Sequence, residues 1–187
     1  MSVRGLMIAR LALTLGMAFC TFGYSACVFK SGDVSGVGSG NDGDVIGGAI
    51  FSTTLTLRDS SGTATTSFVM GEPIRFDLEV LNRTSREQNL QFPDGQIYDI
   101  YVLAANSSQV LWRWGADKSF PQVVTTLSFP PNSSKAYLVG WNAVLSDGTQ
   151  LPAGSYRARG IMVSGDFMGD PLATGELASP LVNFTVR

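Results

Sequence analysis

The chain has 187 residues, which is enough for one well-buried domain once an N-terminal leader is set aside. Apolar residues make up 44% and charged residues 15%, with 21 Gly and 8 Pro, a balance that excludes disorder of the whole chain and is typical of an all-β protein rich in turns. The formal net charge is -2 and the basic residues stand singly among acids, which excludes an electrostatic nucleic-acid binder.

The first segment of the chain has the pattern of a secretory signal peptide. Arg4 and Arg10 supply positive charge, and residues 11–19 form an apolar run without charge. This run is shorter than the ~20 residues that a stable transmembrane helix needs. We therefore predict that residues 1–26 are a signal peptide and that the protein is exported.

Both cysteines, Cys20 and Cys27, lie at this end of the chain, so no disulfide can cross-link the rest of it. The residues Tyr24, Ser25, Ala26 and Cys27 resemble the lipobox of bacterial lipoproteins, with Tyr24 at the position that is usually Leu. The resemblance implies acylation of Cys27 and a lipid anchor in the bacterial cell envelope. The alternative is cleavage after Ala26 without a lipid, which would leave the protein periplasmic or secreted.

Residues 27–49 are rich in Gly, Ser and Asp. They hold too little apolar surface to form a core of their own, so we predict a flexible tether. A glycine-rich phosphate-binding loop is the alternative. No Gly-Lys-Ser or Gly-Lys-Thr motif accompanies the glycines, which speaks against it.

From residue 50 to residue 187 apolar residues recur with a period of two, which predicts strands with one buried face. Clusters of Gly, Pro, Asn and Asp separate these strands at intervals of about 8 to 12 residues, and no helical pattern intervenes. We therefore predict an all-β, immunoglobulin-like antiparallel β-sandwich over residues 50–187. The expected strands lie around residues 51–57, 75–80, 90–92, 98–102, 110–114, 137–141, 156–162 and 182–186.

The sequence offers little for catalysis. It contains no histidine, which excludes Ser-His-Asp and Cys-His catalysis and most zinc and copper sites. Asp94 and Asp99 are the best-placed carboxylates for acid-base chemistry of the glycosidase kind, although acids beside a turn usually cap it. Calcium binding by these two and Asp147 lacks the usual ligand spacing. We expect a protein that is not an enzyme and that needs no metal or cofactor.

The aromatic residues are the most informative group, because such rings dominate both cores and interfaces. Val110, Trp112 and Trp114 share a strand face, which predicts that this face is buried and that both tryptophans pack in the core. Phe120 lies in a loop at residues 115–122, where an apolar side chain is less readily buried in the core. We therefore consider it the anchor of a contact with a partner protein. The candidate contact residues are Lys118, Ser119, Phe120 and Pro121.

Several short motifs follow one another in a fixed order between Phe68 and Met162. They are Gly71-Glu72-Pro73-Ile74, Val80-Leu81-Asn82, Leu90-Gln91-Phe92, Gly95-Gln96-Ile97-Tyr98-Asp99, Val110-Leu111-Trp112-Arg113-Trp114, Phe120-Pro121-Gln122 and Leu151-Pro152-Ala153-Gly154-Ser155-Tyr156. This run resembles the BsuPI-related family, whose founding member is an intracellular inhibitor of a subtilisin-type serine protease. The residues that carry the family motif are Gln96, Tyr98, Asp99, Trp112 and Trp114.

The resemblance implies an immunoglobulin-like sandwich, in agreement with the strand periodicity. It also implies inhibition of a serine protease, for which a subtilisin-like enzyme is the expected partner. This chain departs from the family in its predicted export and in having Pro131-Asn132 where members commonly have Pro-Gly. The alternative function is that of a noncatalytic envelope lipoprotein module that binds another envelope protein or a polysaccharide.

Overall fold

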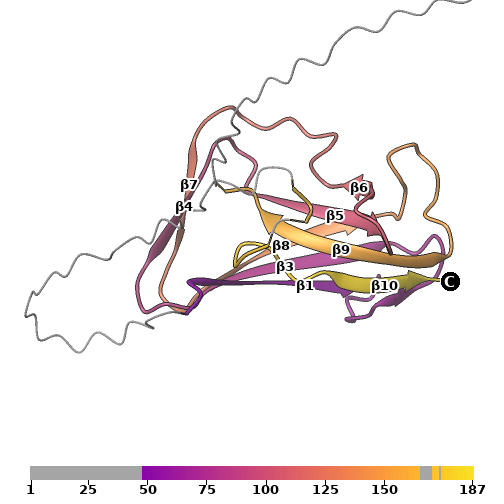
Figure 1. Cartoon of the computed structure of the whole chain (residues 1–187), viewed down its shortest axis with the longest axis horizontal. Coiled ribbons are helices and arrows are strands. Elements are labelled where there is room, and N and C mark those ends of the chain that lie inside the picture. Colours follow the sequence, from indigo (N-terminus) through magenta and orange to yellow (C-terminus); the bar gives the residue numbers. More distant parts are fainter. Residues whose placement is uncertain (1–47, 165–169, 173) are drawn as a thin grey trace, which may run out of the picture. The chain divides into compact units, whose positions relative to one another are not determined.

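The computed structural model describes residues 48–164, 170–172 and 174–187, and these residues form ten strands (Figure 1). The predicted signal peptide, Cys27 and nearly all of the predicted tether lie outside the described residues. Within the described ranges no helix is long and apolar enough to cross a membrane. The strands are β1 (Phe51–Arg58), β2 (Ser67–Phe68), β3 (Ile74–Asn82), β4 (Gln88–Phe92), β5 (Tyr98–Ala104), β6 (Val110–Arg113), β7 (Thr125–Phe129), β8 (Ser134–Trp141), β9 (Gly154–Met162) and β10 (Val182–Val186).

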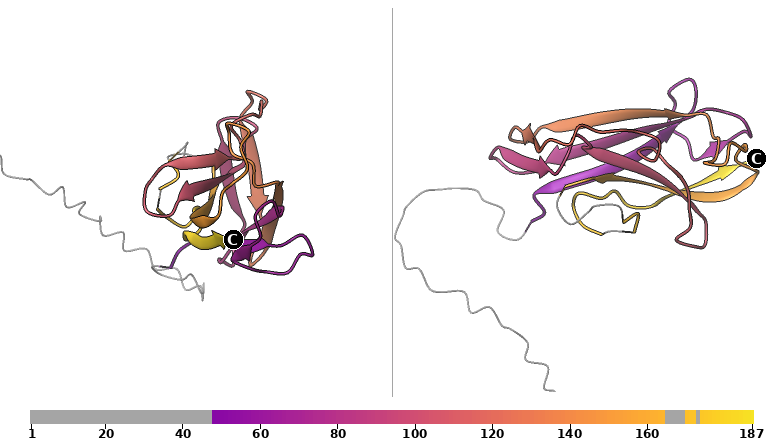
Figure 2. Two further views of the ribbon diagram at one scale, coloured as in Figure 1. Left: turned by 90° about the vertical axis from the view of Figure 1, so that its right-hand side faces the viewer. Right: turned by 90° about the horizontal axis from the view of Figure 1, so that it is seen from above.

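The strands form two packed layers and a small ribbon (Figures 1 and 2). One layer is a three-stranded sheet of order β1-β3-β8, and the other is a five-stranded sheet of order β2-β10-β9-β5-β6. The ribbon pairs β4 with β7. All pairs are antiparallel except the short pair of β2 with β10, which is parallel. The architecture is the predicted all-β, immunoglobulin-like sandwich.

Strict alternation along the strands fills the space between the two layers. On β3, Phe76 and Leu78 are fully buried while Arg75 and Glu79 are exposed, as the period of two predicts. With no cysteine after Cys27, this apolar burial is the main source of stability, at about 1.5–3 kcal/mol for each large side chain. The residues that meet these two from the second layer are Ile100, Val102, Ala158 and Phe184.

Residues 174–181 cover the outer face of the second layer, so β5 and β9 are buried on both faces. The Arg159 side chain donates from Nε to the carbonyl of Ser179 at 2.9 Å, and the Glu176 carboxylate accepts the N–H of Phe51 at 2.9 Å. This cover therefore also holds the start of β1. The outward-facing cluster beneath it consists of Tyr101, Leu103, Ile161 and Ala178.

Two short strands, β2 and β7, were not predicted. The alternation of Leu127 and Phe129 with polar neighbours could have identified β7, but the strand lies between proline-containing turns and is only five residues long. Val110 was expected on the same buried face as Trp112, and this expectation is wrong because Val110 is 40% exposed. The pairing of β5 with β6 shifts register between Val102 and Leu103, and such a bulge reverses which side chains face the core.

The β4–β7 ribbon continues the β3–β8 pair beyond two bends, at residues 83–87 and 130–133, and Asn82 holds both bends. Its buried amide nitrogen lies 2.7 Å from the carbonyl oxygen of Arg86, 2.9 Å from that of Phe129 and 3.0 Å from that of Pro130. Its oxygen accepts the backbone N–H of Thr84 at 2.9 Å. One side chain thus ties the ribbon to the end of β3.

Replacing Asn82 with alanine would leave several buried backbone groups without partners. We expect Asn82→Ala to lower the free energy of unfolding by about 2–3 kcal/mol in urea denaturation. Asn89→Ala, at an exposed position on β4, is the matched control and should change it by less than about 0.5 kcal/mol. Equal effects of the two substitutions would contradict the structural role of Asn82.

Candidate functional site

Two of the crossings between the layers pass through the β4–β7 ribbon. Residues 93–97 lead from β4 into β5, and residues 114–124 lead from β6 into β7 (Figure 1). The two segments lie side by side, because the N–H of Gly95 donates to the carbonyl of Pro121 at 2.8 Å. We call residues 115–124 the crossover loop. It contains all four candidate contact residues.

The carboxylate of Asp99 fixes the start of the crossover loop. This side chain is fully buried, and one of its oxygens accepts the N–H of Ile100 at 2.9 Å and that of Gly115 at 3.0 Å. The other oxygen accepts from the Gln96 side chain at 2.9 Å and from Nε of Arg113 at 2.5 Å. A buried charge is stable only when it is paired and hydrogen-bonded in this way. The family-motif residues Gln96 and Asp99 therefore form a structural network.

A row of aromatic rings in contact with one another supports the crossover loop. The ring of Phe120 lies 5.9 Å from that of Trp114, which lies 4.4 Å from Tyr98, and Tyr98 lies 4.6 Å from Tyr137 on β8. The Nζ atom of Lys118 stands 4.8 Å from the centre of the Trp114 ring, within cation–π range. We call these four rings the aromatic row. It runs from the loop to the facing layer and makes Phe120 half-buried.

Trp112 belongs to a second group of rings that lies within the sandwich. It stacks on Trp141 at 4.8 Å and on Phe76 at 5.9 Å. Trp112 and Trp114 are both partly buried against the main core, so the aromatic motif residues support the fold. None of the five family-motif residues is exposed.

The exposed part of the crossover loop extends beyond the candidate contact residues. Lys118, Ser119 and Pro121 are exposed, whereas Phe120 lies against Trp114. The most exposed large apolar side chains of the segment are Val123 at 59% and Val124 at 65%. Neither valine was among the predicted contact residues. Their sequence could have indicated this exposure, because they are adjacent apolar residues directly before β7. Neighbouring residues of an extended segment point to opposite sides, so one buried face cannot cover both.

The carboxylates considered for acid-base chemistry or calcium each accept hydrogen bonds from nearby groups. Asp94 accepts the N–H of Gln96 at 2.7 Å and so caps a turn, while Asp99 is enclosed by its four donors. Asp147 accepts the hydroxyl and the N–H of Thr149, and these hydrogen bonds lower the pKa of its carboxyl. In the part of the chain that the structure describes, no three acidic or cysteine side chains are placed to hold a metal ion.

The fold and the loop define a noncovalently stabilised β-sandwich that presents a fixed crossover segment. The chain belongs to the BsuPI family, described as intracellular proteinase inhibitor, whose model matches residues 62–167. The match includes the Asp99 network, the aromatic row and the crossover loop, but neither β1 nor β10. Asn132 has a φ of 50°, a conformation that glycine favours and asparagine tolerates, which explains why Asn fits the position at which the resemblance led us to expect Gly. No curated protein matches the chain.

Among solved structures, the CARDB domain of PF1109 from Pyrococcus furiosus is similar, with 12% identity and a TM-score of 0.38 over 74% of this chain and 96% of that domain. A β-glucosidase from Listeria innocua is similar at 10% identity and a TM-score of 0.36. That match covers 72% of this chain and only 16% of the β-glucosidase, so this chain spans a small part of that enzyme.

Gly115 must be glycine if the Asp99 network is to close. A Cβ atom at this position would lie 2.6 Å from the Gln96 side-chain nitrogen and 3.0 Å from an oxygen of Asp99. We expect Gly115→Ala to lower the free energy of unfolding by about 1–3 kcal/mol. Gly140→Ala is the matched control, because nothing lies within 4 Å of its Cβ position, and it should be neutral in thermal and urea denaturation. An equally mild Gly115→Ala would argue against a rigid network.

The buried Tyr101 and the partly buried Tyr137 predict loss of stability at alkaline pH. Burial raises the pKa of Tyr137 to about 12, and burial together with the charge of Asp99 raises the pKa of Tyr101 to about 12. Their ordinary pKa is 10.0, so the folded state holds its phenol protons more tightly than the unfolded state does. Stability is therefore complete below about pH 10 and falls as the pH rises towards 12.

The hydroxyl of Tyr137 has no hydrogen-bond partner among the described residues, which makes this residue the test of that pH dependence. We expect Tyr137→Phe to preserve the free energy of unfolding at pH 7, or to raise it by up to about 1 kcal/mol. It should also reduce the loss of stability between pH 10 and pH 12 in denaturation curves. An unchanged alkaline loss would show that Tyr137 does not titrate as described.

Proposed function

We propose that this chain is a proteinase inhibitor that binds a serine protease, with a subtilisin-like enzyme as the expected class, through the crossover loop. Membership in the BsuPI family supports a protease as the partner. The observation that carries the choice of segment is its fixation at two points, Gly115 on Asp99 and Pro121 on Gly95, while the residues around them stay exposed.

A fixed and exposed segment suits the cleft of a protease. Such clefts bind extended chain by adding backbone hydrogen bonds and taking one side chain into a pocket. A loop that is already ordered loses less conformational entropy on binding, so its affinity rises. Val123 and Val124 supply the exposed apolar contact, and Phe120 supports the loop through Trp114. This assigns the anchor role to the valines and a supporting role to Phe120.

We further propose that the protease lies in the bacterial cell envelope. The support is the leader pattern of residues 1–26 and the lipobox-like residues that end at Cys27. An acylated Cys27 would hold the inhibitor at a membrane, and cleavage without acylation would release it into the periplasm or the medium. Inhibition of this kind needs no catalytic group, cofactor or metal from the chain.

The test is a stoichiometric titration of subtilisin-type and trypsin-type serine proteases with the full chain. We expect inhibition of at least one subtilisin-type enzyme. The double substitution Val123→Ser with Val124→Ser should weaken it by about 30-fold, or about 2 kcal/mol. Val69→Ser is the matched control, because Val69 is similarly exposed at 61% in the connection between β2 and β3, and it should leave inhibition unchanged.

The outcomes separate the two functions under consideration. Inhibition that survives the double substitution would remove Val123 and Val124 from the contact while keeping the inhibitor function. A chain that inhibits no protease and is itself uncut would instead favour a noncatalytic envelope module that binds another protein or a polysaccharide.

A further inference from the structure

Strand β8 is an edge of the three-stranded sheet, and one of its sides has no neighbouring strand among the described residues. Edge strands are usually protected by proline, bulges or charged side chains. Between Ser134 and Trp141 there is no proline, the pairing with β3 is regular, and Lys135 is the single charged residue. The opposite edge differs, since the first N–H of β1 is held by Glu176. β8 is therefore a long and unprotected edge.

The backbone groups of this edge point outward at alternate residues. The N–H of Asn82 donates to the carbonyl of Ser133 at 2.9 Å, which sets the phase of the antiparallel ladder between β3 and β8. Hydrogen-bonded and non-hydrogen-bonded pairs alternate along such a ladder. The N–H and C=O groups of Ala136, Leu138 and Gly140 consequently face away from β3, towards the free side.

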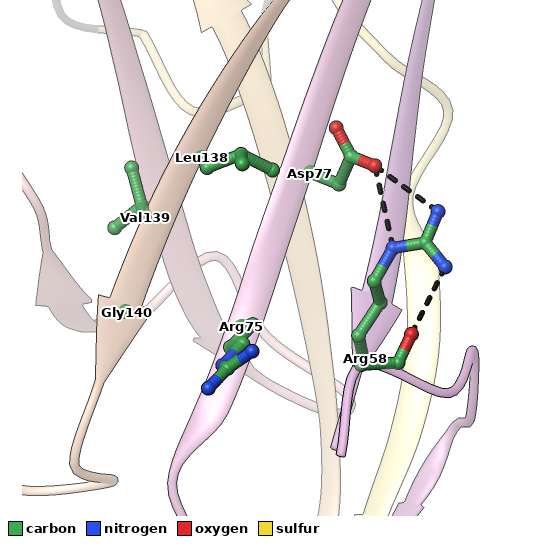
Figure 3. Close-up of a pocket in the computed structure, with 7 residues that line it drawn as sticks. Arg58, Arg75, Asp77, Leu138, Val139 and Gly140 are labelled. Atoms are coloured by element: carbon green, nitrogen blue, oxygen red, sulfur yellow. Dashed lines mark hydrogen bonds and ion pairs between the residues drawn. The ribbon is translucent and has the colours of Figure 1, made fainter. Parts of the chain in front are cut away.

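The outer face of the same strand borders a hollow, and the Leu138 side chain lies over the sheet on the side of Asp77 (Figure 3). Leu138 is 74% exposed, the most exposed large apolar side chain among the described residues. Two residues further on, Gly140 has open space where a side chain would stand. The hollow at this point measures about 510 Å³ and is bordered by Arg75 and Asp77 on β3.

Two charges of opposite sign flank this region on β3. Arg75 lies opposite Gly140 and Glu79 lies opposite Ala136 in the register of the sheet, and both charged side chains are exposed. Neither has an ion pair within the described residues, whereas Asp77 between them pairs with Arg58 at 3.1 Å. The outer face therefore presents one unpaired positive group and one unpaired negative group, symmetrically about Leu138.

We propose that β8 pairs antiparallel with β8 of a second copy of this chain, around a two-fold axis at Leu138. Leu138 then lies opposite the partner's Leu138, and Ala136 lies opposite the partner's Gly140. The outward backbone groups of these residues can exchange about six hydrogen bonds, which joins the two three-stranded sheets into one. Two observations support a second copy as the partner. One is the exposed Leu138 with the open space at Gly140, and the other is the pair of unpaired charges on β3.

This register gives both the exposed Leu138 and the two unpaired charges a partner. Diagonal neighbours across an antiparallel pair are within reach of long side chains, so each Leu138 can lean over the space at the partner's Gly140. Arg75 and the partner's Glu79 are separated by Gly140 and the partner's Ala136, whose small side chains leave room for the two long ones to meet. The same contact occurs twice, because the interface is self-complementary.

Such an interface is small, so the dimer is weak. A pair of strand edges buries less than the ~1,200 Å² typical of stable complexes, and we expect a dissociation constant on the order of 100 μM. The measurement is sedimentation of the full chain from about 5 μM to about 1 mM, with Cys20→Ser and Cys27→Ser so that neither thiol can join two copies. A reversible monomer–dimer equilibrium is expected.

Substitutions at the proposed contact separate it from other self-association. Leu138→Lys should raise the dissociation constant at least about tenfold. Val110→Lys is the matched control, because Val110 is 40% exposed on β6, the edge strand of the other sheet, and it should leave the constant unchanged. Circular dichroism and thermal denaturation verify that both variants are folded.

Charge reversal tests the register. Arg75→Glu or Glu79→Arg alone should raise the dissociation constant about fivefold, and the two together should restore it to within about twofold of the original. A chain that stays monomeric at about 1 mM would overturn the proposal and leave the edge of β8 to an extended segment of another protein. A dimer that is indifferent to Leu138→Lys would overturn it as well.

Discussion

The carboxylate of Asp99 is the contact on which the site depends. Its four donors come from the turn before β5, from the next residue of β5, from the end of β6 and from the start of the crossover loop. A charge without access to water needs all of them, so the four segments hold their positions together or not at all. The crossover loop is thus fixed at its first residue, while most of the residues that follow are exposed.

Much of the fold follows from the sequence because one-sided burial imposes a period of two, and β1 and β3 show it without exception. The features that were missed are set by contacts between distant segments. The exposure of Val110 follows from a bulge in the pairing of β5 with β6, and the burial of both faces of β9 follows from the cover at residues 174–181. Neither feature can be predicted from the sequence pattern of the strand in which it occurs.

The candidate site was predicted in part for the same reason. The short motifs around Gln96, Asp99 and Trp114 could be recognised in the sequence, but their mutual contact could not, because the donors to Asp99 come from two strands and two turns. Phe120 was predicted to contact a partner protein, and its additional contact with Trp114 could not be predicted because it depends on how the loop folds back. The exposed valines lay just beyond the segment that the motifs defined.

The position of Phe51 has a consequence for how the domain can be displayed. Its ring packs on Phe129 at 5.2 Å, so β1 begins at the end of the sandwich that carries the β4–β7 ribbon, whereas the C-terminus lies at the opposite end (Figure 1). A label, bead or carrier protein joined to Arg187 would therefore stand clear of the ribbon. One joined directly before β1 would crowd it, and a spacer would be needed to restore access.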